Sequence, residues 1–160
     1  MNILVTGAGS LLGQGIIKSL ELSKLKFTLF ATDYFSSAIG LYWAKRSFLL
    51  PDLLNTSITD NEWLDSLITI LKNEKIQVLI PGLDFEIPVL SKYKSKIEEE
   101  TSCKIIVSPQ NVVKIGNDKW ETVVFLKEHG FSFPKSPILH NFIFFLAHAH
   151  FSTRAQDWEF

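Results

Sequence analysis

Short apolar runs alternate along the chain with stretches in which apolar residues recur every three or four positions. A run rich in β-branched residues indicates a buried strand, whereas the longer spacing indicates one face of a helix. The predicted strands cover residues 3–5, 27–33, 46–50, 76–80 and 104–108. The first predicted helix, over residues 11–22, would bury a stripe made of Leu12, Ile16, Ile17 and Leu20. Because strands and helices alternate, we expect parallel βαβ units.

Local signals for the ends of helices support this pattern. Ser10 is a suitable N-cap for the first helix, and Thr59 with Glu62 three residues later matches a capping box. Asn117 can cap a later helix, which Gly130 would end. The sequence therefore predicts an α/β fold, a Rossmann-like, doubly wound parallel sheet of about five strands.

The loop after the first predicted strand consists of Gly7, Ala8, Gly9 and Ser10, and the first helix follows at once. Glycines let main-chain N–H groups approach a ligand closely, and a helix N-terminus attracts phosphate or carboxylate. The spacing of Gly7, Gly9 and Gly13 is one residue longer than that of the dinucleotide-binding fingerprint. The loop either binds a ligand or lets the helix pack tightly on the strand, and both interpretations stay open.

Three acidic residues follow predicted strands, at the edge where open α/β sheets bind their ligands. Asp33 lies 20 residues after Gly13, which suits an acid that accepts hydrogen bonds from a ribose. It suits a turn residue that caps the next segment equally well. Asp84 and Glu86 follow the strand over residues 76–80, where they either cap the next helix or hold a polar substrate.

The composition narrows the classes of function. The 160 residues carry a net charge of −1, which gives no electrostatic basis for binding nucleic acid or an anionic membrane. No apolar run approaches the roughly 18 residues of a membrane span. The single cysteine, Cys103, precedes an apolar run and indicates a structural thiol in a reducing, cytoplasmic compartment.

Four segments together resemble the front end of the ATP-grasp ligases, the superfamily that contains biotin carboxylase, carbamoyl-phosphate synthase large subunits and the pyrrolysine-biosynthesis ligase. They read NILVTGAGSLLGQGIIKSL, PGLDFEIPVL, VSPQNVVKIGNDKWETVVFL and LKEHGFSFPKS. The last two are the most specific. In these enzymes a helix that begins Asn-Asp-Lys, runs to a glycine and continues into a proline-containing exit marks the passage into the ATP-binding domain. The resemblance extends from residue 1 to about residue 137.

The resemblance implies a pre-ATP-grasp domain of a ligase that uses ATP and Mg²⁺ to phosphorylate a carboxylate, which an amine then attacks. It implies that Lys119 contacts the nucleotide phosphates as a point charge. It also implies that the loop over residues 7–10, with Asp33, Asp84 and Glu86, faces the acceptor substrate or the nucleotide. The partner would be a small molecule, an amino acid or another carboxylate or amine.

The chain departs from this family after its resemblance ends. We expect a Rossmann-like domain over residues 1–116, a linker helix and the start of the ATP-grasp region over 117–137, and an atypical tail over 138–160. The tail is much shorter than an ATP-grasp domain, so we expect a truncated chain that is inactive alone, with a frame-shifted or unrelated tail. The clustered Phe of the tail would favour a homo-oligomer if exposed. Its three histidines lack the further ligands of a metal site, so no metal site is predicted.

Two other functions remain in view. The glycine loop and Asp33 also suit an NAD(P)-binding reductase or epimerase of the short-chain type. Such enzymes resemble one another in a Tyr-x-x-x-Lys pair, but Ile97 stands four residues after Tyr93, with Lys96 one place short. The third function is that of a non-catalytic module that binds a small molecule.

Overall fold

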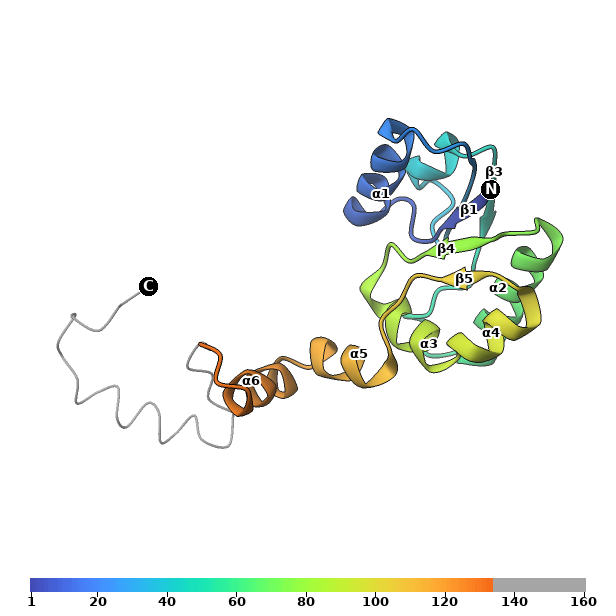
Figure 1. The fold of residues 1–160 in the computed structure, drawn as a ribbon. Helices are drawn as coiled ribbons and strands as arrows, with labels where there is room; N and C mark the ends of the chain where they lie inside the picture. Colours follow the sequence, from blue (N-terminus) through green and yellow to red (C-terminus); the bar gives the residue numbers. More distant parts are fainter. Residues whose placement is uncertain (134–160) are drawn as a thin grey trace. The chain divides into compact units, whose positions relative to one another are not determined.

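The computed structural model describes residues 1–133, which contain a five-stranded sheet in the order β3-β2-β1-β4-β5 (Figure 1). The strands are β1 (Asn2–Val5), β2 (Thr28–Asp33), β3 (Arg46–Leu49), β4 (Val78–Ile80) and β5 (Lys104–Ile105). All four neighbouring pairs are parallel. The predicted α/β, Rossmann-like arrangement is therefore confirmed.

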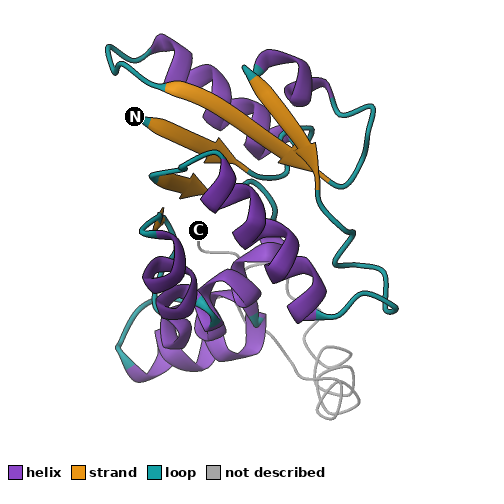
Figure 2. Ribbon diagram, turned by 90° about the vertical axis from the view of Figure 1, so that its right-hand side faces the viewer, coloured by secondary structure: helices purple, strands orange, loops and turns teal. Residues whose placement is uncertain are grey.

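Helices cover both faces of this sheet (Figure 2). On one face lie α1 (Leu11–Leu22) and the short 3-10 helix η1 (Ile39–Trp43). On the other face lie α2 (Asp60–Asn73), α3 (Ile87–Lys92) and α4 (Lys94–Thr101). Helices on both faces bury the central strands β1 and β2, as the apolar runs predict, whereas the edge strand β3 stays largely exposed.

Each face of the sheet has its own hydrophobic core because successive strand residues point to opposite sides. Leu4 of β1 packs in the core under α2, α3 and α4, together with the buried Trp63. The next residue, Val5, packs in the core under α1 and η1, together with Ile17. Cys103 is buried in the first of these cores, which agrees with a structural thiol.

The chain divides into two compact units, Met1–Val113 and a second unit that begins at Lys114. α5 (Gln110–Asn117) contains this boundary, and α6 (Lys119–Glu128) belongs to the second unit. The predicted tail over residues 138–160, with its histidines, and the last residues of the predicted linker region lie outside the described residues. Within residues 1–133 no helix combines the length and the apolar character that a membrane crossing requires.

The caps confirm most of the predicted helix ends. Ser10 Oγ accepts from the Gly13 N–H at 2.8 Å at the start of α1. Thr59 and Glu62 form the predicted capping box at the start of α2. The prediction for Asn117 is wrong, because this residue ends α5.

The cap of α6 is Asp118 instead. Its Oδ1 accepts from the N–H groups of Trp120 at 2.7 Å and Glu121 at 3.2 Å. The adjacent Asp and Asn are both good N-caps, so sequence alone does not separate them.

Two further predictions need correction. The fifth strand ends at Ile105. The Ile106 N–H still donates to the Leu79 carbonyl of β4, but the next N–H, that of Val107, donates to the Ile105 carbonyl at 3.1 Å and so leaves the sheet. The helix stripe is also displaced at its start. Leu12 is 51% exposed, and the buried Gly13 packs against the loop at Gly7 and Ala8 in its place.

Candidate functional site

The candidate site lies at the carboxyl edge of the sheet, where the strand order reverses around β1. The neighbours of β1 are β2 on one side and β4 on the other. Open α/β sheets bind ligands at such a switch point. Of the acidic site residues predicted from the sequence, Asp33 is the last residue of β2, and Asp84 and Glu86 lie shortly after β4.

The glycine loop uses most of its N–H groups inside the chain. The Ala8 N–H donates to the Thr32 carbonyl at 3.1 Å, the Gly9 N–H to Asp33 Oδ2 at 2.8 Å, and the Ser10 N–H to the Gly7 carbonyl at 2.9 Å. These three amides are thus unavailable to an anion from outside. Among the described residues, the first-turn amides of α1 that have no acceptor are those of Leu11 and Leu12.

Packing accounts for the glycines of this loop. Gly7 has a positive φ of 55°, and a Cβ on it would lie 2.3 Å from Leu83 Cγ. A Cβ on Gly13 would lie 2.1 Å from the Gly7 carbonyl oxygen, so α1 packs directly on the loop. A Cβ on Gly9 would lie 2.5 Å from the Ala38 Cβ. The interpretation of the loop as a tight packing turn therefore holds, whether or not a ligand binds beside it.

Asp33 ends β2 with a buried carboxylate that two backbone amides hold in place. Oδ2 accepts from the Gly9 N–H, and Oδ1 accepts from the Phe35 N–H at 2.9 Å. The Phe35 bond is the turn cap that the sequence allowed. Each carboxylate oxygen can accept more than one hydrogen bond, so the group still has acceptor capacity.

A cavity of about 210 Å³ opens beside this carboxylate. We call it the Asp33 cavity, and its lining residues are Gly9, Ser10, Asp33, Tyr34, Phe35, Ala38 and Leu83. The Tyr34 ring meets the Phe85 ring edge to face, with the ring centroids 6.1 Å apart. The cavity therefore brings together three of the predicted site residues, Gly9, Ser10 and Asp33.

Glu86 lies in the interior and does not line the Asp33 cavity. It is buried, and the Thr6 hydroxyl donates to its Oε2. Burial is the main cause that raises the pKa of Glu86 to about 7; the Thr6 hydrogen bond opposes this shift, and the nearby Asp33 charge adds to it. Glu86 acts as an internal link between the loops after β1 and β4.

Sequence reasoning missed Thr6 in this arrangement. Its position directly after the first strand, in the segment TGAGS, was the available signal. The buried Thr32 hydroxyl on the neighbouring strand has no hydrogen-bond partner among the described residues.

Asp84 is exposed and is the first residue of the 3-10 helix η2 (Asp84–Glu86). No side chain caps this helix, so the prediction that Asp84 caps it is wrong. The reason is positional: Leu83 occupies the N-cap, one residue before the acid.

The two edges of the sheet differ in charge. The loops directly after the strands, residues 6–10, 34–38, 50–59, 81–83 and 106–109, contain no Lys, Arg or His. The opposite edge carries exposed Lys24, Lys26, Lys45 and Lys75. The Lys94 ammonium donates to the Val107 carbonyl at 3.0 Å, beside the end of β5. The Asp33 cavity is thus a weakly acidic site without a lining cation.

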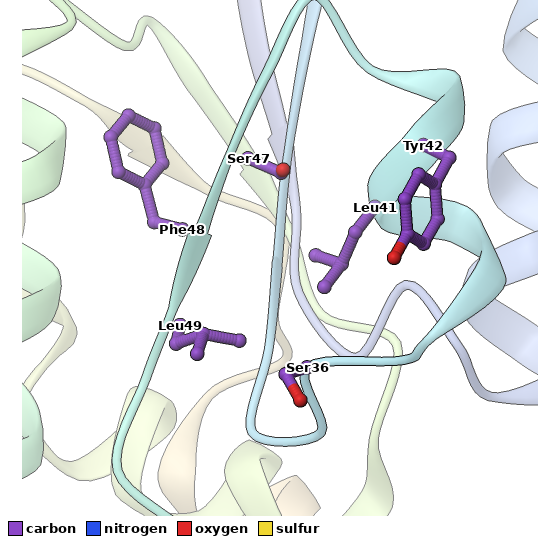
Figure 3. Close-up of a pocket in the computed structure, with 6 residues that line it drawn as sticks. All are labelled: Ser36, Leu41, Tyr42, Ser47, Phe48 and Leu49. Atoms are coloured by element: carbon purple, nitrogen blue, oxygen red, sulfur yellow. The ribbon is translucent and has the colours of Figure 1, made fainter.

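A second cavity, also of about 210 Å³, lies between η1 and the edge strand β3 (Figure 3). Its lining residues are Ser36, Leu41, Tyr42, Ser47, Phe48 and Leu49. No carboxylate or cation lines it, so it offers only hydroxyl groups and apolar surface to a ligand. We therefore take the Asp33 cavity as the candidate site.

Lys119, the predicted nucleotide contact, is the first residue of α6 and is exposed. Among residues 1–133 it makes no ion pair. Three or more His, Cys, Asp or Glu side chains that could hold a metal ion do not gather anywhere in this part of the chain.

A parallel sheet whose order reverses at the first strand, with a glycine loop leading into the first helix, defines a Rossmann-like domain. The sequence model for the family described as PylC-like, N-terminal domain, matches residues 3–106. The chain belongs to this family, and these residues are the N-terminal, pre-ATP-grasp domain of an ATP-grasp ligase.

Two other comparisons add little to this. None of the curated proteins matches the chain. Among solved structures the chain is similar to a dTDP-glucose 4,6-dehydratase from Bacillus anthracis in complex with NAD, with 16% identity and a TM-score of 0.44. The similarity covers 66% of this chain and 36% of the dehydratase. Likeness at this level says nothing about what this chain binds.

Proposed function

We propose that this chain is the substrate-side domain of an ATP-dependent carboxylate–amine ligase, of the kind that includes the carbamoyl-phosphate synthase-like enzymes. The observation that carries the proposal is the family match over residues 3–106. In the whole reaction ATP would phosphorylate a carboxylate, and an amine would attack the acyl phosphate and displace inorganic phosphate. The lone, buried Cys103 is in keeping with a reducing cytoplasmic compartment.

The size of the Asp33 cavity favours a small substrate. Sites for drug-sized ligands usually enclose about 300–1,000 Å³. A cavity of about 210 Å³ suits an amino acid or a molecule of similar size better than a dinucleotide. The Ala8, Gly9 and Ser10 N–H groups are engaged inside the chain, which leaves the Leu11 and Leu12 N–H groups at the start of α1 as donors for a phosphate. The size of the cavity therefore favours the ligase over an NAD(P)-dependent reductase.

Lys119 would contact the ATP phosphates. It is an exposed cation without an ion pair among residues 1–133, so its charge is available to a phosphate oxygen. The same residues hold no carboxylate cluster that fits Mg²⁺, which prefers several oxygen ligands. We therefore propose that residues 1–133 bind substrate, and that groups outside them carry out phosphoryl transfer.

Nucleotide binding tests this proposal. The full chain is titrated with ATP by calorimetry and, separately, with NADH by fluorescence. We expect ATP to bind, and we expect Lys119→Ala to weaken it by about tenfold, because a charge-assisted contact to phosphate is lost. The matched control is Lys127→Ala, an exposed lysine of the same helix, which should leave ATP affinity unchanged. NADH binding without ATP binding would overturn the proposal in favour of the reductase.

A further inference from the structure

We propose that the Asp33 cavity binds the ammonium group of a small amine, so that this domain holds the amine partner of the ligation. The inference rests on the proposed function for the identity of the reaction. The charge and the hydrogen-bonding groups of the ligand are inferred from the residues that line the cavity. The features that carry it are the charge of the lining, the hydrogen bonds already made there and the aromatic wall.

The lining of the cavity carries a single charge, and that charge is negative. Asp33 is the only Lys, Arg, His, Asp or Glu among the seven lining residues. Glu86 is a second acid nearby, close enough for the Asp33 charge to affect its titration. No lysine or arginine occurs in the loops that follow β1, β2 and β4. A bound anion would find no cation here, whereas an ammonium would find a carboxylate.

The hydrogen bonds of the lining point to the same ligand. The Gly9 and Phe35 N–H groups already donate to Asp33, and they hold its carboxylate in one orientation. Ser10 Oγ donates to the Gly82 carbonyl at 2.8 Å and accepts from the Gly13 N–H. The Asp33 carboxylate oxygens can each still accept a hydrogen bond from a ligand. A ligand that donates hydrogen bonds and carries positive charge therefore fits this acceptor.

The walls suit an ammonium rather than a metal ion. Tyr34 and Phe35 line the cavity, and an aromatic ring face attracts an ammonium group within about 6 Å. Mg²⁺ and Ca²⁺ need several oxygen ligands, but the lining supplies one carboxylate. The site thus combines an oriented, buried carboxylate with aromatic surface, the pairing that recognises amines.

The test measures the NMR signals of the Gly9 and Phe35 N–H groups, which donate to Asp33. The ¹⁵N-labelled full chain is titrated with n-butylammonium chloride to about 50 mM, which exceeds a millimolar Kd more than tenfold. Sodium butyrate and AMP are titrated at equal ionic strength. We expect saturable shifts of the Gly9 and Phe35 amide signals with butylammonium and none with the other two probes.

Matched variants locate the effect. Asp33→Asn should weaken butylammonium binding by about tenfold or more, because it removes the charged acceptor. Asp52→Asn is the control, since Asp52 Oδ1 accepts from the Leu54 N–H at 2.9 Å in the same kind of turn but lies outside the cavity. Tyr34→Ala should weaken binding by about two- to fivefold, while Tyr34→Phe should not. The exposed Tyr34 pair decides the question if Asp33→Asn does not fold.

The outcomes separate this inference from the proposed function. Shifts with butyrate or AMP in place of butylammonium would overturn the ammonium site, yet leave a ligase domain that binds another substrate at this edge. Unchanged butylammonium binding in both Asp33→Asn and Tyr34→Ala would also overturn it. The ATP and NADH titrations decide the proposed function by themselves.

Discussion

Thr6 and Glu86, 80 residues apart in the sequence, are hydrogen-bonded to each other in the interior below the carboxyl edge of the sheet. The Thr6 hydroxyl donates to the Glu86 carboxylate and accepts from the Gly82 N–H at 3.3 Å. One side chain thus ties the end of β1 to the loop after β4. This link holds the loops after β1 and β4 together, and it depends on a buried carboxyl group, that of Glu86.

The first prediction concerns the pH dependence of stability. Burial raises the pKa of Glu86 to about 7 from the ordinary value of 4.5, with a smaller contribution from Asp33. Between these two values the folded chain holds a proton that the unfolded chain has lost. Raising the pH through this window therefore favours unfolding, and the free energy of unfolding should fall by about 3 kcal/mol from pH 4.5 to pH 7.

Urea unfolding followed by circular dichroism at several pH values measures this slope. Glu86→Gln keeps a hydrogen-bonding group beside Thr6 but does not titrate, so its stability should vary much less between pH 4.5 and 7. Glu99→Gln, at an exposed position of α4, should keep the slope of the original chain. An undiminished slope in Glu86→Gln would show that other groups cause the pH dependence.

The second prediction compares two glycines of α1. A Cβ at Gly13 would lie 2.1 Å from the Gly7 carbonyl oxygen, whereas a Cβ at Gly15 would meet nothing within 4 Å. Gly13→Ala should therefore destabilise the fold by about 1–3 kcal/mol through overpacking. Gly15→Ala should stabilise it by about 0.5–1 kcal/mol, because alanine is the better helix former. Thermal unfolding of the two variants side by side gives the sign of each change, and equal effects would contradict the packing.

The sequence alone predicts features that depend on neighbouring residues, but not contacts between loops that are far apart in the chain. The sheet and the capping box of Thr59 and Glu62 follow from local patterns, because helix caps and strand runs involve neighbouring residues. The link from Thr6 to Glu86 does not, since it depends on which loops meet at the reversal of strand order.

The same reason explains the uncertainty about Asp33. Its partner Gly9 lies 24 residues away, and only the fold shows that the Gly9 N–H donates to its carboxylate. The exposure of Leu12 has a related cause. A helix stripe predicts apolar contacts, but close packing on the Gly7 loop requires a glycine at the contact.

The third prediction concerns the start of α6. Asp118 accepts from the Trp120 and Glu121 N–H groups, while Asn117 ends the preceding helix. Asp118→Ala should speed hydrogen exchange at these two amides, by an amount that corresponds to about 1 kcal/mol of local stability. Asn117→Ala serves as the comparison and should leave their exchange nearly unchanged. Faster exchange at these amides in Asn117→Ala than in Asp118→Ala would show instead that Asn117 is the cap.

The fourth prediction concerns the reactivity of Cys103. Burial, together with the nearby negative charge of Glu98, raises the pKa of its thiol to about 12. The thiolate is the reactive form, and at pH 8 a thiol with this pKa is ionised to about 10⁻⁴. The folded chain should therefore react with DTNB (5,5′-dithiobis-2-nitrobenzoate) more than a thousandfold slower than the chain in urea, by about the ratio of the two thiolate fractions.

The single cysteine makes this experiment simple to interpret, because all of the released thionitrobenzoate comes from Cys103. The labelling rate should rise with urea in parallel with the unfolded fraction, since only the unfolded chain exposes the thiol. Cys103→Ala provides the blank. Labelling of the folded chain at a rate near that in urea would mean that the thiol reaches solvent and that its buried, structural role is wrong.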